Sequence, residues 1–287
     1  MKNLPAILVL FLIQATIVAC SQAPEKAVVP GYNFAKPEIF KMPPVLDEIS
    51  GITFRNGNPD TIFAEQDEEG RLFYFHPGDK EPKHIKFASA GDYEDLAICN
   101  GQMFVLRSNG SLFNFPIASI GQEEVEATEQ KDLLDKEEYE ALYADENNHR
   151  LYVLCKSCSD DKGEQSVSGF VFSVGANGEL APAGQFSIED KAEEGKSEGK
   201  KGRKKFRPSA MAKHPVTNEW YIISSVNKLL VVTDENWKLL NTYPLGAGLF
   251  NQPEGLAFDK SGNLYISNEI GTAGDATILK FIYHPKK

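Results

Sequence analysis

The sequence has 287 residues, of which 41% are hydrophobic and 25% are charged. This composition is typical of a globular protein and excludes a collagen-like, a wholly disordered or a multi-span membrane protein. The 41 acidic residues outnumber the 30 basic residues, so the formal net charge is −11. Because nucleic-acid-binding proteins usually carry a basic surface, we expect no nucleic-acid partner.

The N-terminal residues 1–19 have the features of a bacterial lipoprotein signal peptide. Lys2 precedes an apolar stretch that ends at Ala19, and its length suits a signal peptide better than a membrane-spanning helix. Small residues directly before Cys20 are similar to a lipobox, in which the cysteine begins the mature protein and carries acyl chains such as palmitate. An uncleaved anchor, or cleavage beside an incidental cysteine, is the alternative.

The signal peptide predicts an exported protein that is held at the outer side of a bacterial cell membrane by the lipid on Cys20. Residues 20–32 contain prolines and no hydrophobic periodicity, so we interpret them as the lipidated cysteine and a tether. The folded domain is expected to span residues 33–287.

This domain contains five repeats of one pattern, whose starts are separated by 44, 46, 68 and 46 residues. Each repeat begins with a strand of small residues, continues with a turn and two strands rich in aromatic and branched residues, and in most cases adds a weaker fourth strand. Four strands in about 45 residues is the size of one β-propeller blade. The repeats begin at Ser50, Glu94, Glu140, Pro208 and Glu254.

The repeats predict an all-β fold, a β-propeller of five blades. Residues 37–42 precede the first repeat and are expected to supply the missing fourth strand of the last blade, which closes the ring and removes open sheet edges. A sixth blade would require a degenerate unit in residues 116–139, and a β-sandwich with coincidental spacing is the alternative fold.

The charged, aromatic-free residues 189–205 lengthen the third interval and are predicted to form a flexible insertion.

The motif Cys155-Lys-Ser-Cys158 is a single CxxC pair. One pair cannot complete a four-ligand zinc site, and no second cysteine pair or histidine pair lies nearby in the sequence. In an oxidising compartment a local disulfide that closes the turn is the favoured interpretation.

Four stretches at the starts of repeats and around them, in this order, resemble the SdiA-regulated family. They lie at residues 46–52, 94–97, 207–215 and 252–269, and the similarity extends over residues 37–287. The resemblance implies a β-propeller, often exported and tethered to a membrane, without a well-defined biochemical activity. The fourth repeat departs from the pattern, because Pro208 stands where an acidic or hydroxyl residue would be expected.

The candidate site consists of acids at the starts of the inner strands. Glu94, Glu140 and Glu254 share one position of the repeat, and Glu48 lies two residues before Ser50, on the same face of its strand. In a closed ring these carboxylates converge near the axis and repel each other, and calcium, which accepts six to eight oxygen ligands, would neutralise them. Further ligands would come from Glu65, Asp67, Asn268 and Glu269, unless these four are surface residues.

The alternative for the acids of the inner strands is that they cap strands or pair with basic groups such as Arg107 and Lys156. No catalytic motif supports an enzyme, since the sequence has no GxSxG elbow, phosphate-binding loop or HExxH. We therefore expect a membrane-anchored binding module for a small ligand, a cation or an envelope protein. The alternative function is a calcium-dependent lactonase or esterase with an axial site.

Overall fold

The computed structural model describes residues 28–159, 161, 166–189, 205–271 and 274–285. Regular structure in these ranges consists of β-strands and three short 3-10 turns. No helix in this part of the chain is long and apolar enough to cross a membrane. The predicted signal peptide, Cys20 and most of the predicted insertion at 189–205 lie outside the described residues.

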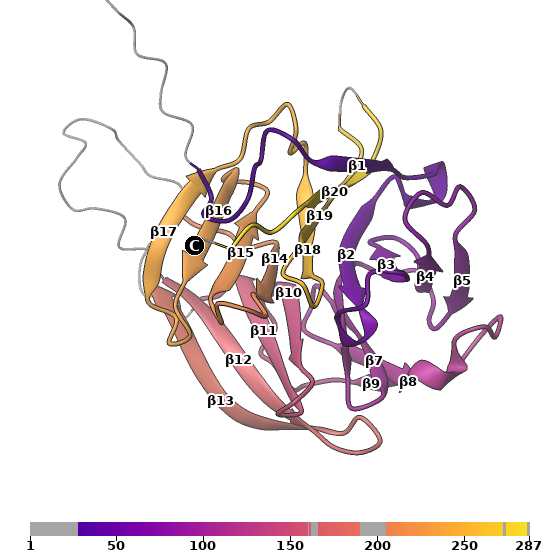
Figure 1. The fold of residues 1–287 in the computed structure, drawn as a ribbon. Helices are drawn as coiled ribbons and strands as arrows, with labels where there is room; N and C mark the ends of the chain where they lie inside the picture. Colours follow the sequence, from indigo (N-terminus) through magenta and orange to yellow (C-terminus); the bar gives the residue numbers. More distant parts are fainter. Residues whose placement is uncertain (1–27, 160, 162–165, 190–204, 272–273, 286–287) are drawn as a thin grey trace, which may run out of the picture.

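Five antiparallel sheets of four strands surround one axis, so the predicted five-bladed β-propeller is confirmed (Figure 1). The first blade contains β2 (Ile49–Phe54), β3 (Ile62–Gln66), β4 (Arg71–Phe75) and β5 (Lys83–Lys86). The second contains β6 (Tyr93–Cys99), β7 (Gln102–Arg107), β8 (Leu112–Pro116) and β9 (Thr128–Gln130). The third contains β10 (Glu138–Asp145), β11 (Arg150–Ser157), β12 (Ser166–Val174) and β13 (Leu180–Glu189). The fourth contains β14 (Ala210–Lys213), β15 (Trp220–Ser224), β16 (Leu229–Thr233) and β17 (Leu239–Pro244).

The fifth blade joins the two ends of the domain. It contains β18 (Pro253–Phe258), β19 (Leu264–Asn268), β20 (Thr277–Phe281) and β1 (Glu38–Lys41). Strand β1 pairs with β20 in antiparallel register, from Glu38 opposite Lys280 to Lys41 opposite Thr277. Residues 37–42 therefore close the ring as predicted. The segment 116–139 supplies β9, the outer strand of the second blade, and forms no sixth blade.

The five inner strands, β2, β6, β10, β14 and β18, contact one another in a ring around the axis. Small residues are needed where neighbouring strands meet. A Cβ atom on Gly51 would lie 2.5 Å from Oδ1 of Asp95, and one on Gly255 would lie 2.4 Å from the carbonyl oxygen of Ser50. Both distances are shorter than van der Waals contact, so the ring closes tightly only with glycine at these positions.

Buried polar side chains connect neighbouring blades near the axis. The carboxylate of Asp95 on β6 accepts a hydrogen bond from the N–H of Leu142 on β10 at 2.7 Å. The hydroxyl of Ser267 on β19 donates to the carbonyl of Ser50 on β2 at 2.6 Å and so joins the last blade to the first. These bonds fix the blades relative to each other near the axis.

Aromatic and aliphatic side chains fill the space between the blades. Between the third and fourth blades, Trp220 is fully buried and lies 5.0 Å from Tyr143, ring centre to ring centre. Trp237 stacks on Trp220 at 4.1 Å and on Phe186 at 3.7 Å. Each interface of this kind buries large apolar surfaces, which supply most of the stabilisation of the fold.

Replacing Gly255 with alanine should destabilise the ring, because the added methyl group has no room between Ser267 and Ser50. We expect the free energy of unfolding to fall by about 1–3 kcal/mol, the usual cost of overpacking a core. Urea unfolding followed by tryptophan fluorescence measures this change.

The matched control is Gly248→Ala, since a Cβ atom at Gly248 would have no neighbour within 4 Å. That variant should stay within about 0.5 kcal/mol of the parent protein. Equal stability of the two variants would contradict a tightly closed inner ring.

Candidate functional site

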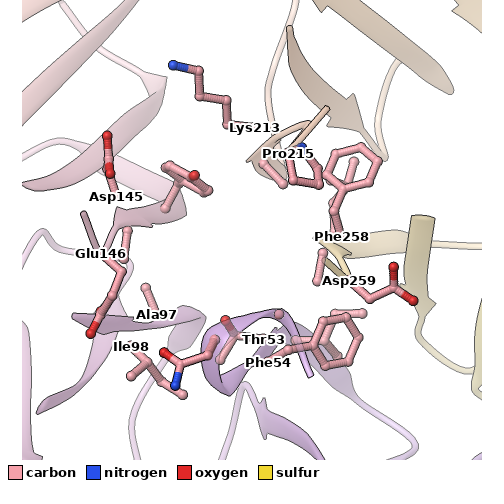
Figure 2. A pocket seen from close by; sticks show the side chains of 18 of the residues that line it. Thr53, Phe54, Ala97, Ile98, Asp145, Glu146, Lys213, Pro215, Phe258 and Asp259 are labelled. Atoms are coloured by element: carbon pink, nitrogen blue, oxygen red, sulfur yellow. The ribbon is translucent and has the colours of Figure 1, made fainter. Parts of the chain in front are cut away.

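The axis of the propeller has two ends with different chemistry. The inner strands begin at one end, which we call the acidic end, with Glu48, Glu94, Glu140, Glu254, Asp67 and Glu269 near it. They finish at the other end, which we call the wide mouth. There a cavity of about 400 Å³ is lined by residues of all five blades, among them Thr53, Ile98, Glu146, Lys213 and Phe258 (Figure 2).

Three carboxylates line the wide mouth, and each accepts backbone hydrogen bonds; that of Glu146 accepts from the N–H of Asn100 at 3.1 Å. Asp145 accepts hydrogen bonds from the N–H groups of Asn147 and Asn148 at 3.1 and 3.2 Å. Asp259 accepts from the N–H groups of Ser261 and Asn263 at 2.9 and 3.0 Å. These acids hold the loops that follow the inner strands, so they are poorly available to a ligand.

At the acidic end an ammonium group lies among the predicted ligands. Lys156, near the end of β11, forms an ion pair with the buried Glu140 and a second one with Glu138 at 3.1 Å. Its charge also favours the ionised forms of Glu94 and Glu254. For Glu140 the structure thus shows the pairing with Lys156 that the sequence left as the alternative.

Glu94 and Glu254 differ in how their charges are compensated. Burial raises the pKa of Glu254, and hydrogen bonds from the side chains of Ser209 and Ser225 oppose that shift. Burial, followed by repulsion from Asp92, raises the pKa of Glu94 to about 8. Within the described ranges no hydrogen bond or ion pair to the carboxyl group of Glu94 is present. Glu94 is therefore largely protonated at neutral pH.

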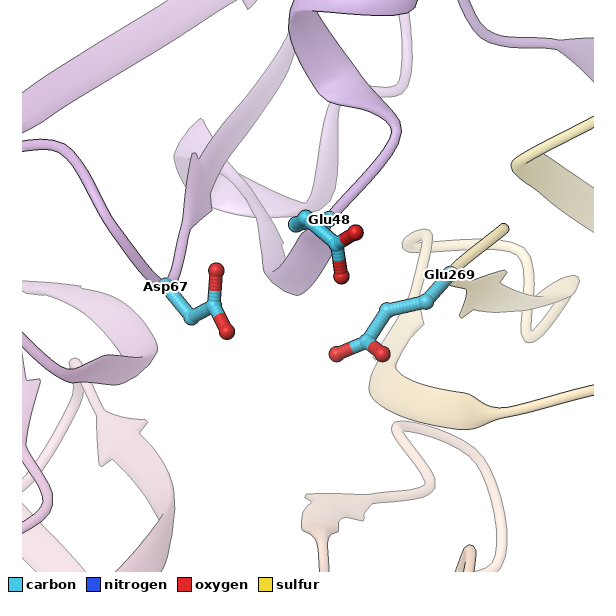
Figure 3. Close-up of side chains that lie close together, drawn as sticks. All are labelled: Glu48, Asp67 and Glu269. Carbon is cyan, nitrogen blue, oxygen red and sulfur yellow. The ribbon is translucent and has the colours of Figure 1, made fainter. Parts of the chain in front are cut away.

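A second group of acids lies beside the first. Glu48 precedes β2, Asp67 follows β3 and Glu269 follows β19, and one carboxylate oxygen of each lies within 4.8 Å of those of the other two (Figure 3). In Figure 3 the three side chains come from separate loops and point toward one another.

In the described chain the three carboxylates of this second group form no ion pair, although the charge of Lys156 opposes the rise in the pKa of Glu269. Burial raises the pKa of Asp67 to about 6, with repulsion from Glu48 as the next cause. Burial and repulsion from Glu254 raise the pKa of Glu269 to about 8. Mutual repulsion and partial dehydration therefore favour a positively charged ligand here.

Two carboxylate oxygens of this group differ in their hydrogen bonding. Oδ1 of Asp67 is inaccessible to solvent and has no hydrogen-bond partner. Oε2 of Glu269 accepts a hydrogen bond from the side-chain amide of Gln252 at 2.5 Å, which orients that carboxylate. One oxygen is thus without a donor, and another is already positioned.

The structure divides the predicted ligands between these two groups. Glu94, Glu140 and Glu254 lie around Lys156, whereas Glu48 lies with Asp67 and Glu269. The role of all four predicted residues as metal ligands stays a prediction.

The surface location considered for the four additional ligands is wrong for three of them, because Glu65, Asn268 and Glu269 are buried and only Asp67 is half-buried. Oε1 of Glu65 accepts from the N–H of Gly51 at 2.6 Å. Glu65 thus supports the inner strand from the neighbouring one.

The central position of Lys156 and the bridging role of Asp95 were not predicted. The position of Asp95 directly before the apolar run Leu96-Ala97-Ile98 was the available signal for its burial.

The two cysteines of the CxxC motif are joined in a disulfide, which closes the end of β11. Cys155 is fully buried and Cys158 nearly so. This bond lies beside the position from which Lys156 extends toward the axis. It therefore fixes the backbone that positions the ammonium group.

Comparison with protein families supports the resemblance seen in the motifs. The SdiA-regulated family model matches residues 185–271. This range contains the fourth blade and the two inner strands of the fifth, and it includes two of the four stretches that carry the resemblance. No curated protein shows a significant sequence match to the chain.

Solved structures with a similar fold are distant in sequence. A luciferin-regenerating enzyme aligns with a TM-score of 0.51 and 9% identity, over 86% of this chain and 95% of that chain. The glutaminyl cyclase of Myxococcus xanthus gives 0.52 and 12%, over 85% and 95%. Regucalcin of Agrobacterium tumefaciens, a calcium-binding protein, gives 0.48 and 10%, over 86% and 93%. At these identities the luciferin-regenerating enzyme and the glutaminyl cyclase share the propeller fold with this chain, and no activity follows from the similarity.

The raised pKa of Glu94 predicts a specific pH dependence of stability. Between its unfolded value near 4.5 and its folded value of about 8, the folded protein holds a proton that the unfolded chain releases. Glu94 therefore lowers the stability as the pH rises through this window. In Glu94→Gln the decline should be shallower by at most about 1.4 kcal/mol per pH unit, the value for one proton.

Urea unfolding at pH 5, 6, 7 and 8 measures this slope. Glu124→Gln is the control, because Glu124 forms an exposed ion pair with Lys86 on the outside of the propeller. The control should keep the slope of the parent protein. The assignment fails if Glu94→Gln keeps that slope as well.

Proposed function

We propose that this protein is a binding module, anchored to the outer side of a bacterial membrane through Cys20, that binds a cation at the acidic end of its propeller. The observation that carries the proposal is the group of Glu48, Asp67 and Glu269. One carboxylate oxygen of each lies within 4.8 Å of those of the other two, and no ion pair in the described chain involves them. The anchor is inferred from residues 1–20 of the sequence.

The dimensions of the group suit calcium. Calcium binds carboxylate oxygens at about 2.3–2.6 Å, so two ligands on opposite sides of the ion lie about 4.6–5.2 Å apart. The separations in the group fall within that limit. Three carboxylates from loops of two blades provide the hard, negatively charged oxygens that calcium and magnesium prefer, whereas zinc and copper prefer nitrogen and sulfur.

The buried oxygen of Asp67 supports the same proposal. A carboxylate oxygen that is removed from water without a hydrogen-bond donor is energetically costly, and a bound cation would offset that cost. Three carboxylates leave part of the coordination sphere of calcium open. Oxygen atoms of a small ligand or of an envelope protein would complete it, and the cation would then serve as the contact for that partner.

Calcium titration into the protein by isothermal calorimetry tests this proposal. We expect one binding event per chain, and Asp67→Asn should lower the affinity at least tenfold because it removes a charged ligand. The affinity should rise between pH 6 and pH 8, since bound protons must leave Asp67 and Glu269, with pKa values of about 6 and about 8, before the cation binds.

The matched control is Asp132→Asn on the outside of the second blade, where Asp132 is exposed and its backbone adopts a left-handed conformation that asparagine also tolerates. This variant should bind calcium like the parent protein. Absence of binding to the parent protein at millimolar calcium and magnesium would refute the proposed cation site.

The second candidate function is a cation-dependent hydrolase acting on a lactone or an ester. The observation that favours it is Glu94, whose pKa of about 8 gives a carboxylic acid that can donate a proton at neutral pH. Hydrolysis of a panel of lactones and aryl esters distinguishes the two functions. An enzyme requires turnover that is lost on chelation and reduced at least a hundredfold by Glu94→Gln, whereas a binding module shows no turnover with any substrate.

A further inference from the structure

The position at which the chain enters the propeller indicates which side faces the membrane. The described chain begins at residue 28, and Val29 and Tyr32 are buried against the fourth and fifth blades. The hydroxyl of Tyr32 donates to the carbonyl of Gly262 at 2.5 Å, and the N–H of His284 donates to the carbonyl of Gly31 at 2.8 Å. Gly262 lies in the turn after β18, at the wide mouth, so the chain leaves the domain on that side.

The chain between this point and the proposed lipid is short. Eight residue steps separate Cys20 from Val28. Since an extended chain advances at most about 3.6 Å per residue, their Cα atoms lie no more than about 29 Å apart. A lipid on Cys20 therefore brings the membrane close to the side of the propeller from which Val28 emerges.

Exposed apolar side chains gather on the same side. Val216 and Leu240 line one depression of about 640 Å³ together with Gly31 and Tyr283. Ile282 adjoins Tyr283 in the sequence, and Val28 lies two residues before Pro30, which also lines the depression. We call the four exposed side chains Val28, Val216, Leu240 and Ile282 the apolar patch; they are four of the seven large hydrophobic residues exposed in the described chain.

One tyrosine beside the apolar patch suits the boundary between lipid and water. Tyr283 lines the depression and is half-buried, and it combines an apolar ring with a polar hydroxyl, whereas Tyr221 and Tyr243 belong to the buried core beneath the depression. Tyrosine is enriched where proteins meet the headgroup region of a bilayer for this reason. Aliphatic side chains beside it can enter the outer acyl region, and they add to the affinity supplied by an acyl chain.

We propose that the apolar patch rests on the phospholipid bilayer that holds the lipid of Cys20, so that the wide mouth faces the membrane and the acidic end faces away from it. This inference rests on the anchoring proposed above and is independent of cation binding. In this orientation Glu48, Asp67 and Glu269 are presented to the compartment rather than to the lipid headgroups.

Two valines at opposite ends of β15 provide a matched test. Val216 precedes the strand on the side of the wide mouth and is 55% exposed, whereas Val226 follows it on the side of the acidic end and is 50% exposed. Each is replaced by cysteine in the lipidated protein and labelled with a nitroxide. Cys99 is buried and Cys155 is bonded to Cys158, so labelling is directed to the new residue.

The labelled proteins are reconstituted into vesicles of phosphatidylethanolamine and phosphatidylglycerol at 3:1. For Val216→Cys, the rate at which the label collides with a water-soluble nickel chelate should fall at least threefold on reconstitution. The rate at which it collides with oxygen should rise. For Val226→Cys both rates should stay unchanged. Equal shielding of the two labels, stronger shielding at position 226, or no shielding of either overturns the proposed orientation.

Failure of the anchor itself is recognised separately. Cys20→Ser should leave the detergent phase in Triton X-114 partitioning, while the parent protein remains in it. If the parent protein also stays in the aqueous phase, the anchoring is wrong and the membrane-facing patch is refuted with it. Calcium binding is measured by calorimetry without a membrane. Its outcome does not depend on whether the protein is lipid-anchored or on how it is oriented.

Discussion

Neighbouring inner strands of the propeller approach so closely that a methyl group on Gly51 would meet Asp95 at 2.5 Å. This contact sets the diameter of the ring, and the diameter decides how near the side chains at the ends of the inner strands come to each other. Asp95 converts the contact into a bond, because its buried carboxylate accepts an N–H from each of two inner strands, at Leu96 and Leu142. The acidic end is a consequence of this narrow ring.

Crowding of acids at one end of the axis is unfavourable for the fold and useful for binding. Lys156 offsets part of the repulsion through its ion pairs with Glu138 and Glu140. The pKa of Glu269 nevertheless rises to about 8, so the free protein holds extra protons there. A cation that replaces those protons would stabilise the folded state, and binding would then be coupled to stability and to pH.

The fold could be predicted from the sequence because the blade is a local repeat. Strand, turn and strand recur every 44 to 46 residues apart from the longer interval before Pro208, and residues 37–42 contain the strand that the last blade lacks. The candidate site could be predicted only in outline. Which acids share a group depends on side-chain directions and on Lys156. The sequence named Lys156 as a possible partner of these acids, but its strand position does not reveal that it reaches Glu140 in particular.

The prediction also treated the acids of the inner strands as equivalent, and the structure shows that their partners differ. Ser209 and Ser225 bond to Glu254, Lys156 pairs with Glu140, and no described donor reaches Glu94. These differences arise between blades, from residues that are far apart in the sequence. Repeat position therefore locates an acid at the axis without determining its protonation.

The strand that completes the last blade has a consequence for biosynthesis. A chain that emerges from its amino end releases β1 first and β20 last, and β20 is the strand with which β1 pairs at the outer edge of the blade. Residues 38–41 must then wait, unpaired, until nearly the whole polypeptide has been synthesised. A strand of four residues that carries Glu38 and Lys41 is a poor template for association with other chains during this delay.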